Sequence, residues 1–447
     1  MPPKNDSVEA KKLKGFRDFP PEEAALRQKI CDKIIECGSR AGFQLISTPS
    51  IEYAEVLLGS GGNETDKEVY RFLDHGERPV ALRYDLTIGF ARFVAEHLHE
   101  LVLPFKKMQI GEVWRGEKPQ KGRYRQFCQG DFDIIGADSY RADVEVIVGI
   151  VSVLKDLVPG AFTVYISNRK ILSGLIKTFF PKITDSGEKN MLIALDKLRK
   201  IGSDKVKAVI AEDSEIGPGN FDKLMAVLDP ADKTADTLAM AKSVLVDSSC
   251  KDEVVRLEKT IEIIQASRPK DALYKVVVDL STARGLAYYT GIVFETLVDQ
   301  MEALGSISSG GRYDGLVSRF LGEEQNVPGV GGSVGVDRLL AVLAEIAPAK
   351  APTVKAFVAI ADEAADVYAF RIAAALRASG ISCDVATKAQ KLGQQFRHAS
   401  RLEIPFVITV GEDEVKSNTF AVKNMVDRSE EKGVPFADLI ETMKRLM

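Results

Sequence analysis

An amphipathic helix is the first element that the pattern of apolar and polar positions predicts. Residues 20–43 open with proline and glutamate, carry apolar side chains at roughly helical spacing and end beside a glycine. Farther along, two strand-like runs, 101–116 and 123–136, flank the polar segment 117–122, EKPQKG. Two apolar runs around a short polar segment predict an antiparallel strand pair with a basic turn.

The second of these runs, RYRQFCQGDFDIIG, has two different faces, because residues two apart on a strand point the same way. One face carries Tyr124, Gln126, Cys128, Phe132 and Ile134. The other carries Arg123, Arg125, Phe127, Gln129, Asp131 and Asp133. The second face passes from cationic through aromatic to anionic. A solvated strand face is the plain alternative, but the aromatic ring and the amide in the same stripe favour a strand that lines a cleft.

The rest of the chain divides into regions that differ in the spacing of their apolar residues. Lysine, alanine, leucine and aspartate dominate between 171 and 270 with helical spacing, and strand-like runs return at 274–281 and 291–298. A glycine-rich stretch, 329–348, runs into an apolar helix, and strands and helices alternate after a linker-like segment, 347–355. The pattern predicts an α+β fold with an antiparallel-sheet core in two parts, a helical insertion and a C-terminal α/β domain. The predicted boundaries are 1–170 and 271–346 for the core, 171–270 for the insertion and 354–447 for the last domain.

Composition and charge narrow the class of protein. The chain has 447 residues, a formal net charge of −4 and 28% charged residues, so binding to nucleic acid would need local basic patches. The five cysteines form no C-x-x-C pair and the four histidines show no ligand spacing, so we expect a reducing compartment and no metal held by protein side chains. No signal peptide and no apolar run of roughly 18 residues is found. We therefore expect a cytoplasmic protein.

Candidate chemistry lies in several separate segments. LRYDLT places the carboxylate of Asp85 and the hydroxyl of Thr87 on one face, where both can accept from an ammonium group. Cations suited to polyphosphate come from a turn, from the segment ARGLAYYTG and from the start of an apolar helix: Arg115, Lys118, Lys121, Arg123, Arg284 and Arg338. A single such arginine is usually salt-bridged structure, but the separated set favours an anion site. Because neither G-x-x-x-x-G-K-[ST] nor a G-x-G-x-x-G after a strand occurs, ATP would be held by arginines on an antiparallel sheet.

The predicted last domain carries a basic helix at 388–401, KAQKLGQQFRHASR. It contains four lysines and arginines besides a histidine and has no acidic residue. At helical spacing, Gln394, Arg397, His398 and Arg401 share one face. From this pattern alone, an ordinary solvated helix and a nucleic-acid surface are equally good interpretations.

Several motifs in order resemble those of the histidyl-tRNA synthetases, a family of class II aminoacyl-tRNA synthetases. WRGEKPQKGRYRQFCQGDFDIIG resembles the second class-defining motif, and RGLAYYTG resembles the segment particular to this family. STPSIEYAEVL matches the first motif, with Pro49 on the dimer interface, and KGFRDFP, LRYDLT, SSGGRYDGL and the Arg338 helix follow the family's order. The resemblance covers nearly the whole chain and implies a class II catalytic core followed by an anticodon-binding domain.

The resemblance implies ATP, with Mg²⁺, as a cofactor of the reaction. It implies ATP-binding roles for Arg115, Glu117, Arg123, Phe127 and Arg338. Arg115 would hold the α-phosphate, Arg123 and Arg338 the outer phosphates, and Phe127 would stack on adenine. A flat ring between cations and acids matches the composition of the predicted strand face.

The resemblance also implies a histidine site, formed by Asp85, Thr87, Gln129, Asp133, Arg284, Tyr288 and Tyr289. The first three would take the α-ammonium group. Asp133 and Tyr289 would bind the two imidazole nitrogens, with Tyr288 beside them. Arg284 would bridge the substrate carboxylate and the α-phosphate, so that Arg284 and Arg115 are the implied catalytic residues. The family commonly has aspartate where this chain has Ala287.

The implied function is histidine–tRNA ligase: a homodimer that activates L-histidine with ATP to histidyl-adenylate, releasing pyrophosphate, and then transfers histidine to tRNA(His), with no membrane association. Two alternatives stay open. One is the non-catalytic paralogue that regulates histidine biosynthesis, although this chain keeps a C-terminal domain and the arginine set. The other is a class II synthetase for another amino acid, against which AYYTG and Asp133 argue.

Overall fold

The computed structural model describes residues 8–59, 63–120, 122–216, 219–230, 234–246, 250–282, 288–322, 325–346 and 354–447. The chain forms two compact units, Met1–Pro348 and Ala349–Met447. Lys121, Arg284 and Ala287 of the sequence predictions, as well as most of the linker-like segment, lie outside the described residues. Among the described helices, none is both long and apolar enough to cross a membrane.

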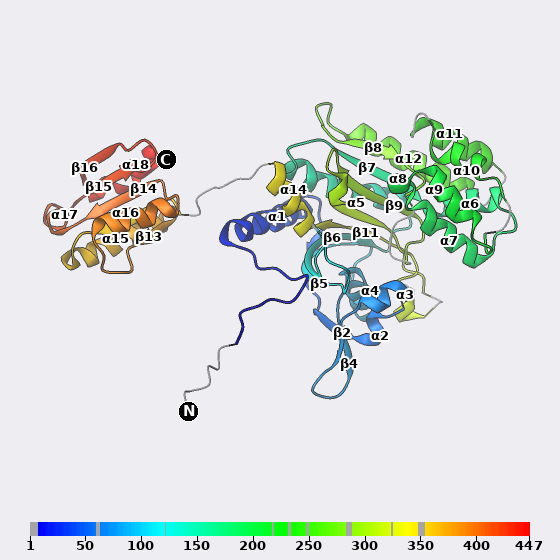
Figure 1. The fold of residues 1–447 in the computed structure, drawn as a ribbon, viewed down its shortest axis with the longest axis horizontal. Helices are drawn as coiled ribbons and strands as arrows, with labels where there is room; N and C mark the ends of the chain where they lie inside the picture. The colour runs from blue at the N-terminus through cyan, green and yellow to red at the C-terminus, as the bar shows by residue number, and fades with distance from the viewer. Residues whose placement is uncertain are drawn as a thin grey trace. The chain divides into compact units, whose positions relative to one another are not determined.

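An eight-stranded mixed sheet is the centre of the first unit (Figure 1). Its strands, in spatial order, are β1 (Gln44–Leu45), β5 (Phe105–Trp114), β6 (Gln126–Ile135), β11 (Gly329–Gly335), β10 (Ser308–Arg312), β9 (Ile292–Val298), β7 (Phe162–Asn168) and β8 (Lys275–Val278). The six strands from β5 to β7 pair antiparallel, and a parallel strand is added at each edge. The α+β class and the antiparallel core predicted from the sequence are confirmed.

The predicted strand pair exists as β5 and β6, which run in register from Trp114 opposite Gln126 to Phe105 opposite Ile135. The second strand is shorter than predicted. Arg123 forms an isolated bridge with Gln120, and the Arg125 amide donates to the Gly15 carbonyl rather than to a strand neighbour. The cationic end of the predicted stripe therefore lies on the approach to the strand, where the Arg125 carbonyl still accepts from the Arg115 amide.

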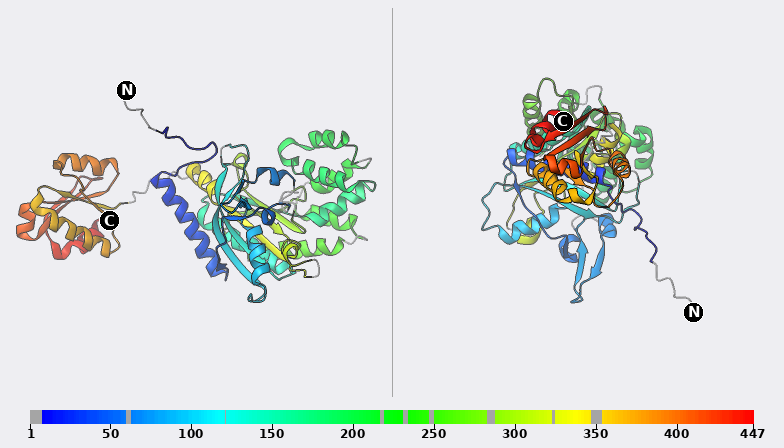
Figure 2. Two further views of the ribbon diagram at one scale, coloured as in Figure 1. Left: turned by 90° about the horizontal axis from the view of Figure 1, so that it is seen from below. Right: turned by 90° about the vertical axis from the view of Figure 1, so that its left-hand side faces the viewer.

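Helices cover one face of this sheet. They are α1 (Pro21–Arg40), α5 (Tyr140–Leu157) and α14 (Val336–Ile346). Figure 2 shows α1 and α14 side by side along the sheet. The even-numbered residues of β6 face these helices: a Cβ added to Gly130 would lie 2.6 Å from Ile34 Cδ1, and one added to Gly38 would lie 2.9 Å from the Phe132 ring. The odd-numbered residues of β6 therefore point to the opposite face.

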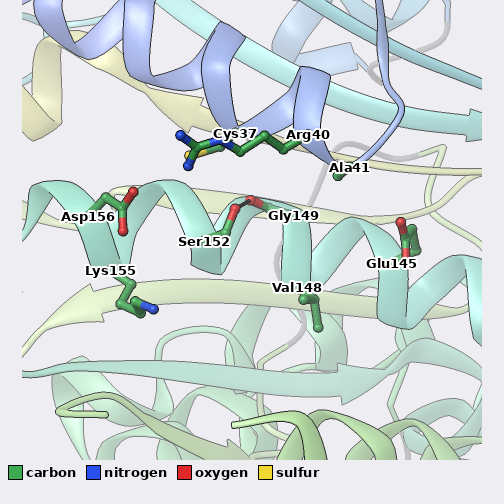
Figure 3. A pocket seen from close by; sticks show the side chains of 9 residues that line it. All are labelled: Cys37, Arg40, Ala41, Glu145, Val148, Gly149, Ser152, Lys155 and Asp156. Carbon is green, nitrogen blue, oxygen red and sulfur yellow. Dashed lines mark hydrogen bonds between the residues drawn. The ribbon is translucent and has the colours of Figure 1, made fainter. Parts of the chain in front are cut away.

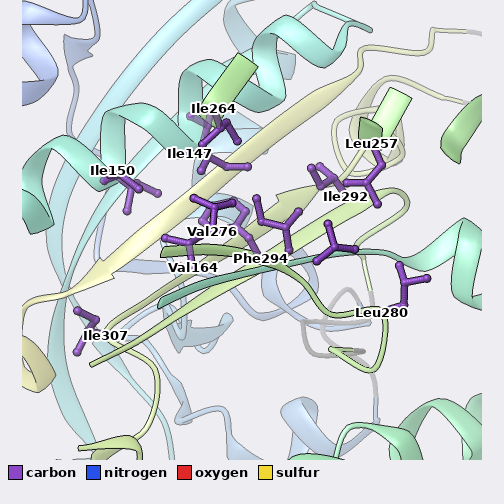
Figure 4. Packing of buried hydrophobic residues seen from close by; sticks show 14 of the residues in the cluster. Ile147, Ile150, Val164, Leu257, Ile264, Val276, Leu280, Ile292, Phe294 and Ile307 are labelled. Carbon is purple, nitrogen blue, oxygen red and sulfur yellow. The ribbon is translucent and has the colours of Figure 1, made fainter. Parts of the chain in front are cut away.

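The main apolar core lies between the sheet and its helices and continues toward the helices that follow β7. Figure 4 shows Ile147 and Ile150 of α5, Phe294 of β9, Val164 of β7 and Ile264 of α12 (Lys251–Ser267) packed together. Burial of such branched side chains contributes roughly 1.5–3 kcal/mol each. The glycine-rich stretch of the sequence supplies β11 and then α14, so its first half is a central strand.

Further helices follow β7: α6 (Arg169–Phe179), α7 (Asp185–Leu195), α8 (Leu198–Ile201), α9 (Ser203–Ala211), α10 (Phe221–Leu228), α11 (Ala235–Val244) and α12 (Lys251–Ser267). Residues before the second motif form a small sheet with β2 (Ile51–Tyr53), β4 (Pro79–Leu82) and β3 (Arg71–Leu73). Short helices accompany that sheet and the later strands: α2 (Ala54–Leu57), α3 (Asn63–Glu68), α4 (Thr87–His97), a 3₁₀ turn (Glu302–Leu304) and α13 (Ser318–Leu321).

The second unit is an α/β domain on a five-stranded sheet. The strand order is β13 (Cys383–Val385), β12 (Ala356–Ile360), β14 (Phe406–Val410), β15 (Thr419–Asn424) and β16 (Glu430–Pro435), and the first three are parallel. The helices are α15 (Asp366–Ala378), α16 (Leu392–Arg401), α17 (Glu412–Ser417) and α18 (Leu439–Leu446), with two 3₁₀ turns (Glu363–Ala365 and Phe436–Asp438). The predicted basic helix is α16. Buried Gln395 bonds it to both backbone groups of Ile360.

Arg312 is a buried cation that ties three elements together. Its guanidinium donates to Asp143 Oδ1 of α5 at 2.5 and 3.0 Å, to Asp314 Oδ1 at 3.1 Å and to the Ala137 and Ser139 carbonyls at 3.2 Å. Asp143 also pairs with Arg256 of α12 at 3.2 Å. This network fixes the end of β10 against α5.

We predict that Arg312→Met lowers the free energy of unfolding by about 3–5 kcal/mol, because it leaves the buried Asp143 carboxylate with half of its cations. Chemical denaturation of the full chain measures the change. Arg141→Met is the control, since exposed Arg141 lies on α5 beside the network and should cost no more than about 0.5 kcal/mol. Equal effects of the two variants would contradict a structural role for the Arg312 network.

Candidate active site

Strand register places the candidate residues in two rows across the open face of the sheet. One row runs Lys107, Asp133, Gly331 and Gly311 across β5, β6, β11 and β10. The next runs Gln109, Asp131, Ser333 and Ser309 across the same strands. Both acids of β6 therefore face away from α1 and α5, on the side where the small residues of β10 and β11 leave room.

Asp133 is fully buried, with an ion-pair partner on one carboxylate oxygen and a hydrogen-bond donor on the other. Lys107 Nζ lies 2.7 Å from Oδ2, and the side chains of the pair are 0% and 1% exposed. The Tyr313 hydroxyl donates to Oδ1 at 2.5 Å. A buried carboxylate needs such partners to offset the free-energy cost of leaving water.

Glycine is required beside this carboxylate. A Cβ on Gly331 would overlap the Asp133 carboxylate, and one on Gly311 would lie 2.9 Å from the Tyr289 ring. Tyr289 therefore packs over the bare backbone of β10, beside Asp133. The predicted imidazole residues, Asp133 and Tyr289, are brought together by the two glycines.

Asp85 is the third buried acid and belongs to the turn before α4. Its carboxylate accepts from the Ile88 amide and from the Tyr288 hydroxyl, both at 3.1 Å. The Tyr288 hydroxyl also contacts Thr87, and its ring lies 5.0 Å from that of Tyr289. Burial raises the pKa of Asp85, opposed by the Ile88 amide, Arg115 and Tyr288. Asp85, Thr87, Tyr288 and Tyr289 thus form one contiguous group.

Asp131 lies in the second row, next to Gln129 and Ser333. Burial raises the pKa of Asp131 to about 7; Lys107 opposes the rise, whereas Asp133 adds to it. Gln129 Nε2 donates to Ser333 Oγ at 3.0 Å. This corner has more acid than cation and is suited to a positively charged group such as an ammonium.

The cationic part of the site lies around Phe127 at the start of β6. The Arg115 guanidinium lies 5.2 Å from the Phe127 ring centroid and donates through Nε to the Tyr84 carbonyl at 3.0 Å. Glu117 pairs with Arg123 and lies 3.9 Å from Arg115. The structure therefore brings Arg115, Glu117, Arg123 and Phe127 together as one group.

Arg338 is the last of the predicted ATP-binding cations. It lies in the first turn of α14, directly after β11, whose last residue Gly335 pairs with Gln129. Its guanidinium donates to the Ser306 carbonyl. Arg338 therefore lies between the end of β11 and the segment that leads into β10.

Three residues of the site were missed by sequence reasoning: Lys107, Tyr313 and Ser333. Lys107 and Gln109 alternate on β5 as polar residues inside an apolar run, a signal that predicts a polar face. Tyr313 stands in the quoted segment SSGGRYDGL, but its contact with Asp133 depends on which strands pair. Ser333 becomes visible only through its register opposite Asp131.

A hollow of about 320 Å³ opens elsewhere, between α1 and α5 (Figure 3). It lies on the helix-covered face of the sheet, away from Asp133. Its two acids have cations of their own: Glu145 pairs with Lys106 at 2.7 Å and Asp156 lies 3.6 Å from Lys33. Nothing there matches the candidate chemistry. In the described parts of the chain, no three histidine, cysteine, aspartate or glutamate residues group as metal ligands.

We predict that Asp131→Asn stabilises the protein increasingly as the pH rises from about 4 to about 7. The folded chain binds the Asp131 proton more tightly than the unfolded chain, because burial raises this pKa from 3.8 to about 7. The unfolding free energy of the wild type therefore falls by a few kcal/mol as the pH rises across that window. An amide at this position does not ionise, so the variant keeps that stability. Denaturant unfolding of both proteins at several pH values measures it; a difference that is independent of pH would contradict the assignment.

Comparisons with known proteins agree with this geometry. The family model described as histidyl-tRNA synthetase matches residues 15–339, and the one described as anticodon binding domain matches residues 354–446. A histidine–tRNA ligase of Helicobacter pylori (strain P12) is 38% identical over 424 residues, 94% of each chain.

Solved structures give the same result. A histidyl-tRNA synthetase from Nostoc sp. PCC 7120 is 29% identical with a TM-score of 0.84 and covers 99% of this chain and 100% of its own. An ATP phosphoribosyltransferase regulatory subunit/histidyl-tRNA synthetase from Bacillus halodurans shares the fold at a TM-score of 0.75 and 22% identity, over 91% of this chain and 99% of its own. With the catalytic-core and anticodon-domain matches in one chain and a relative aligned over nearly its whole length, this chain belongs to the histidyl-tRNA synthetase family.

Proposed function

We propose that the protein is a histidine–tRNA ligase, which activates L-histidine with ATP and transfers it to the 3′ end of tRNA(His). The observation that carries the proposal is the single sheet face on which a buried acid group meets an arginine–phenylalanine group, in a chain of this family. Such a face matches a substrate pair that joins an ammonium and an imidazole to an adenine and a polyphosphate.

Histidine would occupy the acid end. The α-ammonium lies with Asp85, Thr87 and Gln129, where acid exceeds cation. The imidazole lies against Asp133 and Tyr289, with Tyr288 alongside, so that both ring nitrogens have a polar partner. An amino acid without these nitrogens would leave buried groups unpaired, which discriminates strongly and without editing.

ATP would occupy the arginine end, with adenine on the Phe127 ring and Glu117 setting the spacing of Arg115 and Arg123. The histidine carboxylate attacks the α-phosphorus, a new C–O–P bond forms, and the bond to the β-phosphate breaks to release pyrophosphate. Arg115 and Arg284 lower the repulsion between the two anions and stabilise the charge of the transition state. Arg123 and Arg338 take the outer phosphates.

Mg²⁺ would arrive with the ATP phosphates. This ion is commonly bound by substrate phosphates, water and one or two carboxylates rather than by a cage of side chains. The ion would neutralise phosphate charge as pyrophosphate leaves.

We assign tRNA recognition to the second unit, in part to α16. Gln394, Arg397, His398 and Arg401 of this helix are all exposed on it, as single-stranded bases require. The helices α6–α12 form the proposed insertion between the two parts of the core. We further propose a cytoplasmic homodimer that meets near Pro49, where Ile51, Tyr53, Phe72 and Leu73 of the small sheet are exposed apolar side chains.

We predict that the protein exchanges pyrophosphate into ATP when histidine is present and not with the other amino acids. Isotope exchange with the purified full chain measures this first half-reaction. Histidine-dependent exchange establishes both the activation step and the substrate. Exchange with a different amino acid would assign another class II specificity, and absence of exchange despite histidine binding would favour the regulatory paralogue.

Removal of residues 354–447 should spare histidine activation and reduce charging of tRNA(His) by at least about tenfold, because the second unit is compact by itself and contributes none of the proposed catalytic residues. Pyrophosphate exchange and aminoacylation are measured on the same preparation. The control is the four-site variant Gln394→Ala, Arg397→Ala, His398→Ala and Arg401→Ala, which keeps the domain. Loss of exchange on truncation would mean that the second unit also supports the catalytic core.

A further inference from the structure

Lys107 is a buried charge that the proposed reaction does not use. Its side chain is 0% exposed, although lysine is almost never fully buried unless paired. Taking an ammonium group out of water costs several kcal/mol even with a partner. A buried charge that destabilises the fold in this way is best explained by a functional role. The position of Lys107 opposite Asp133 on the neighbouring strand indicates a role in the site.

The contacts of Lys107 point at one carboxylate oxygen. Its Nζ lies 2.7 Å from Asp133 Oδ2 and 4.7 Å from the centroid of the Phe90 ring, which walls it from solvent. Oδ1 of the same carboxylate receives the Tyr313 hydroxyl at 2.5 Å. Each oxygen has a second lone pair, so an ionised Asp133 held in this way can still accept a hydrogen bond from a ligand.

The other ionisable groups around this pair come from every neighbouring element. They are Asp131 of β6, Asp85 before α4, Tyr289 before β9, Tyr313 after β10, Arg83 after β4 and Arg115 after β5. Arg83 acts on Asp131, but its guanidinium bonds to the Thr48, Pro49 and Glu112 carbonyls. Arg115 acts on Asp85. Lys107 is the cation paired directly with Asp133, and it also opposes protonation of Asp131.

Neutral imidazole presents one N–H donor and one acceptor nitrogen. The Asp133 carboxylate can accept from that N–H, and its negative charge makes the hydrogen bond stronger than one to a neutral acceptor. The charge on Asp133 is therefore the property that recognition depends on, and burial alone acts against that charge.

We propose that Lys107 is the positioning residue for imidazole recognition: it pairs with the Asp133 carboxylate and holds it in place against the ring, and through the neighbouring Asp131 it sets the pH range over which the site accepts histidine. The inference rests on the proposed function and deepens it, since it assigns the specificity of the site to a cation beneath the carboxylate that touches substrate. Lys107 itself touches the carboxylate and acts through it.

The test compares Lys107→Met and Lys107→Arg with Lys106→Met in the full chain. Lys106 is the matched control, because it is the preceding residue of β5, points to the opposite face and pairs with Glu145 at 2.7 Å. Histidine-dependent pyrophosphate exchange is measured from about pH 6 to about pH 9, with kcat and KM determined separately for histidine and ATP. Thermal unfolding of each variant checks that the fold is kept.

Lys107→Met should raise the histidine KM by roughly 10- to 100-fold at pH 7, because a recognition hydrogen bond is lost, while the ATP KM changes by no more than about twofold. The acidic limb of kcat/KM for histidine should move to higher pH, since Asp131 is then buried without the cation that lowers its pKa. Lys107→Arg should restore the position of the limb, and Lys106→Met should match the wild type.

A limb that stays in place in folded Lys107→Met, or equal rises in both KM values, would overturn the proposal and leave Lys107 a structural residue. If Lys107→Met does not fold, the double variant Lys107→Met with Asp133→Asn removes both charges together. The proposal then requires Lys107→Arg to keep the wild-type limb and the double variant to lose histidine discrimination as Asp133→Asn does. Absence of exchange in the wild type would reject the proposed function itself, an outcome distinct from all of these.

Discussion

The need to partner a buried charge is the constraint on which this sheet face depends. Asp133 lies in the middle of a central strand, where its carboxylate is shielded from solvent. The neighbouring strand β5 supplies Lys107, and the residue after β10 supplies the Tyr313 hydroxyl. Replacing the pair by apolar side chains of similar volume is often neutral or stabilising in proteins. The charges are therefore better explained by recognition than by stability.

Strand pairing brings these partners together from distant parts of the chain. β6 pairs with β5, which is close in sequence, and with β11, about two hundred residues later. β11 in turn places β10, whose end carries Arg312 and Tyr313. Arg312 holds this end against α5, and its carbonyl accepts from Thr290, directly after Tyr289. A structural cation thus positions both tyrosines that approach Asp133, which links the stability of the core to the geometry of the site.

Local pattern was sufficient for the parts of the fold that depend on local order. Alternation along β6 assigned Phe127, Gln129, Asp131 and Asp133 to one face, and the polar turn predicted the β5–β6 pair. The sequence pattern does not determine the register between strands, so the pairing of Lys107 with Asp133 could not be predicted. The glycines of β11 gave no hint of a central strand, because glycine disfavours strands; Gly331 is explained only by the carboxylate that fills the place of its side chain.

The site contains more acidic groups than cations to pair with them, and this surplus has a consequence for binding. Asp131 has a pKa of about 7 because burial and Asp133 outweigh Lys107. On the proposed function, a substrate ammonium group placed beside Asp131 supplies the missing cation and lowers that pKa, so binding and proton release are linked near neutral pH. The same surplus of acid that destabilises the free protein then favours a cationic ligand. Because only a ligand with the correct charge relieves this unfavourable interaction, the destabilising acid makes the site selective.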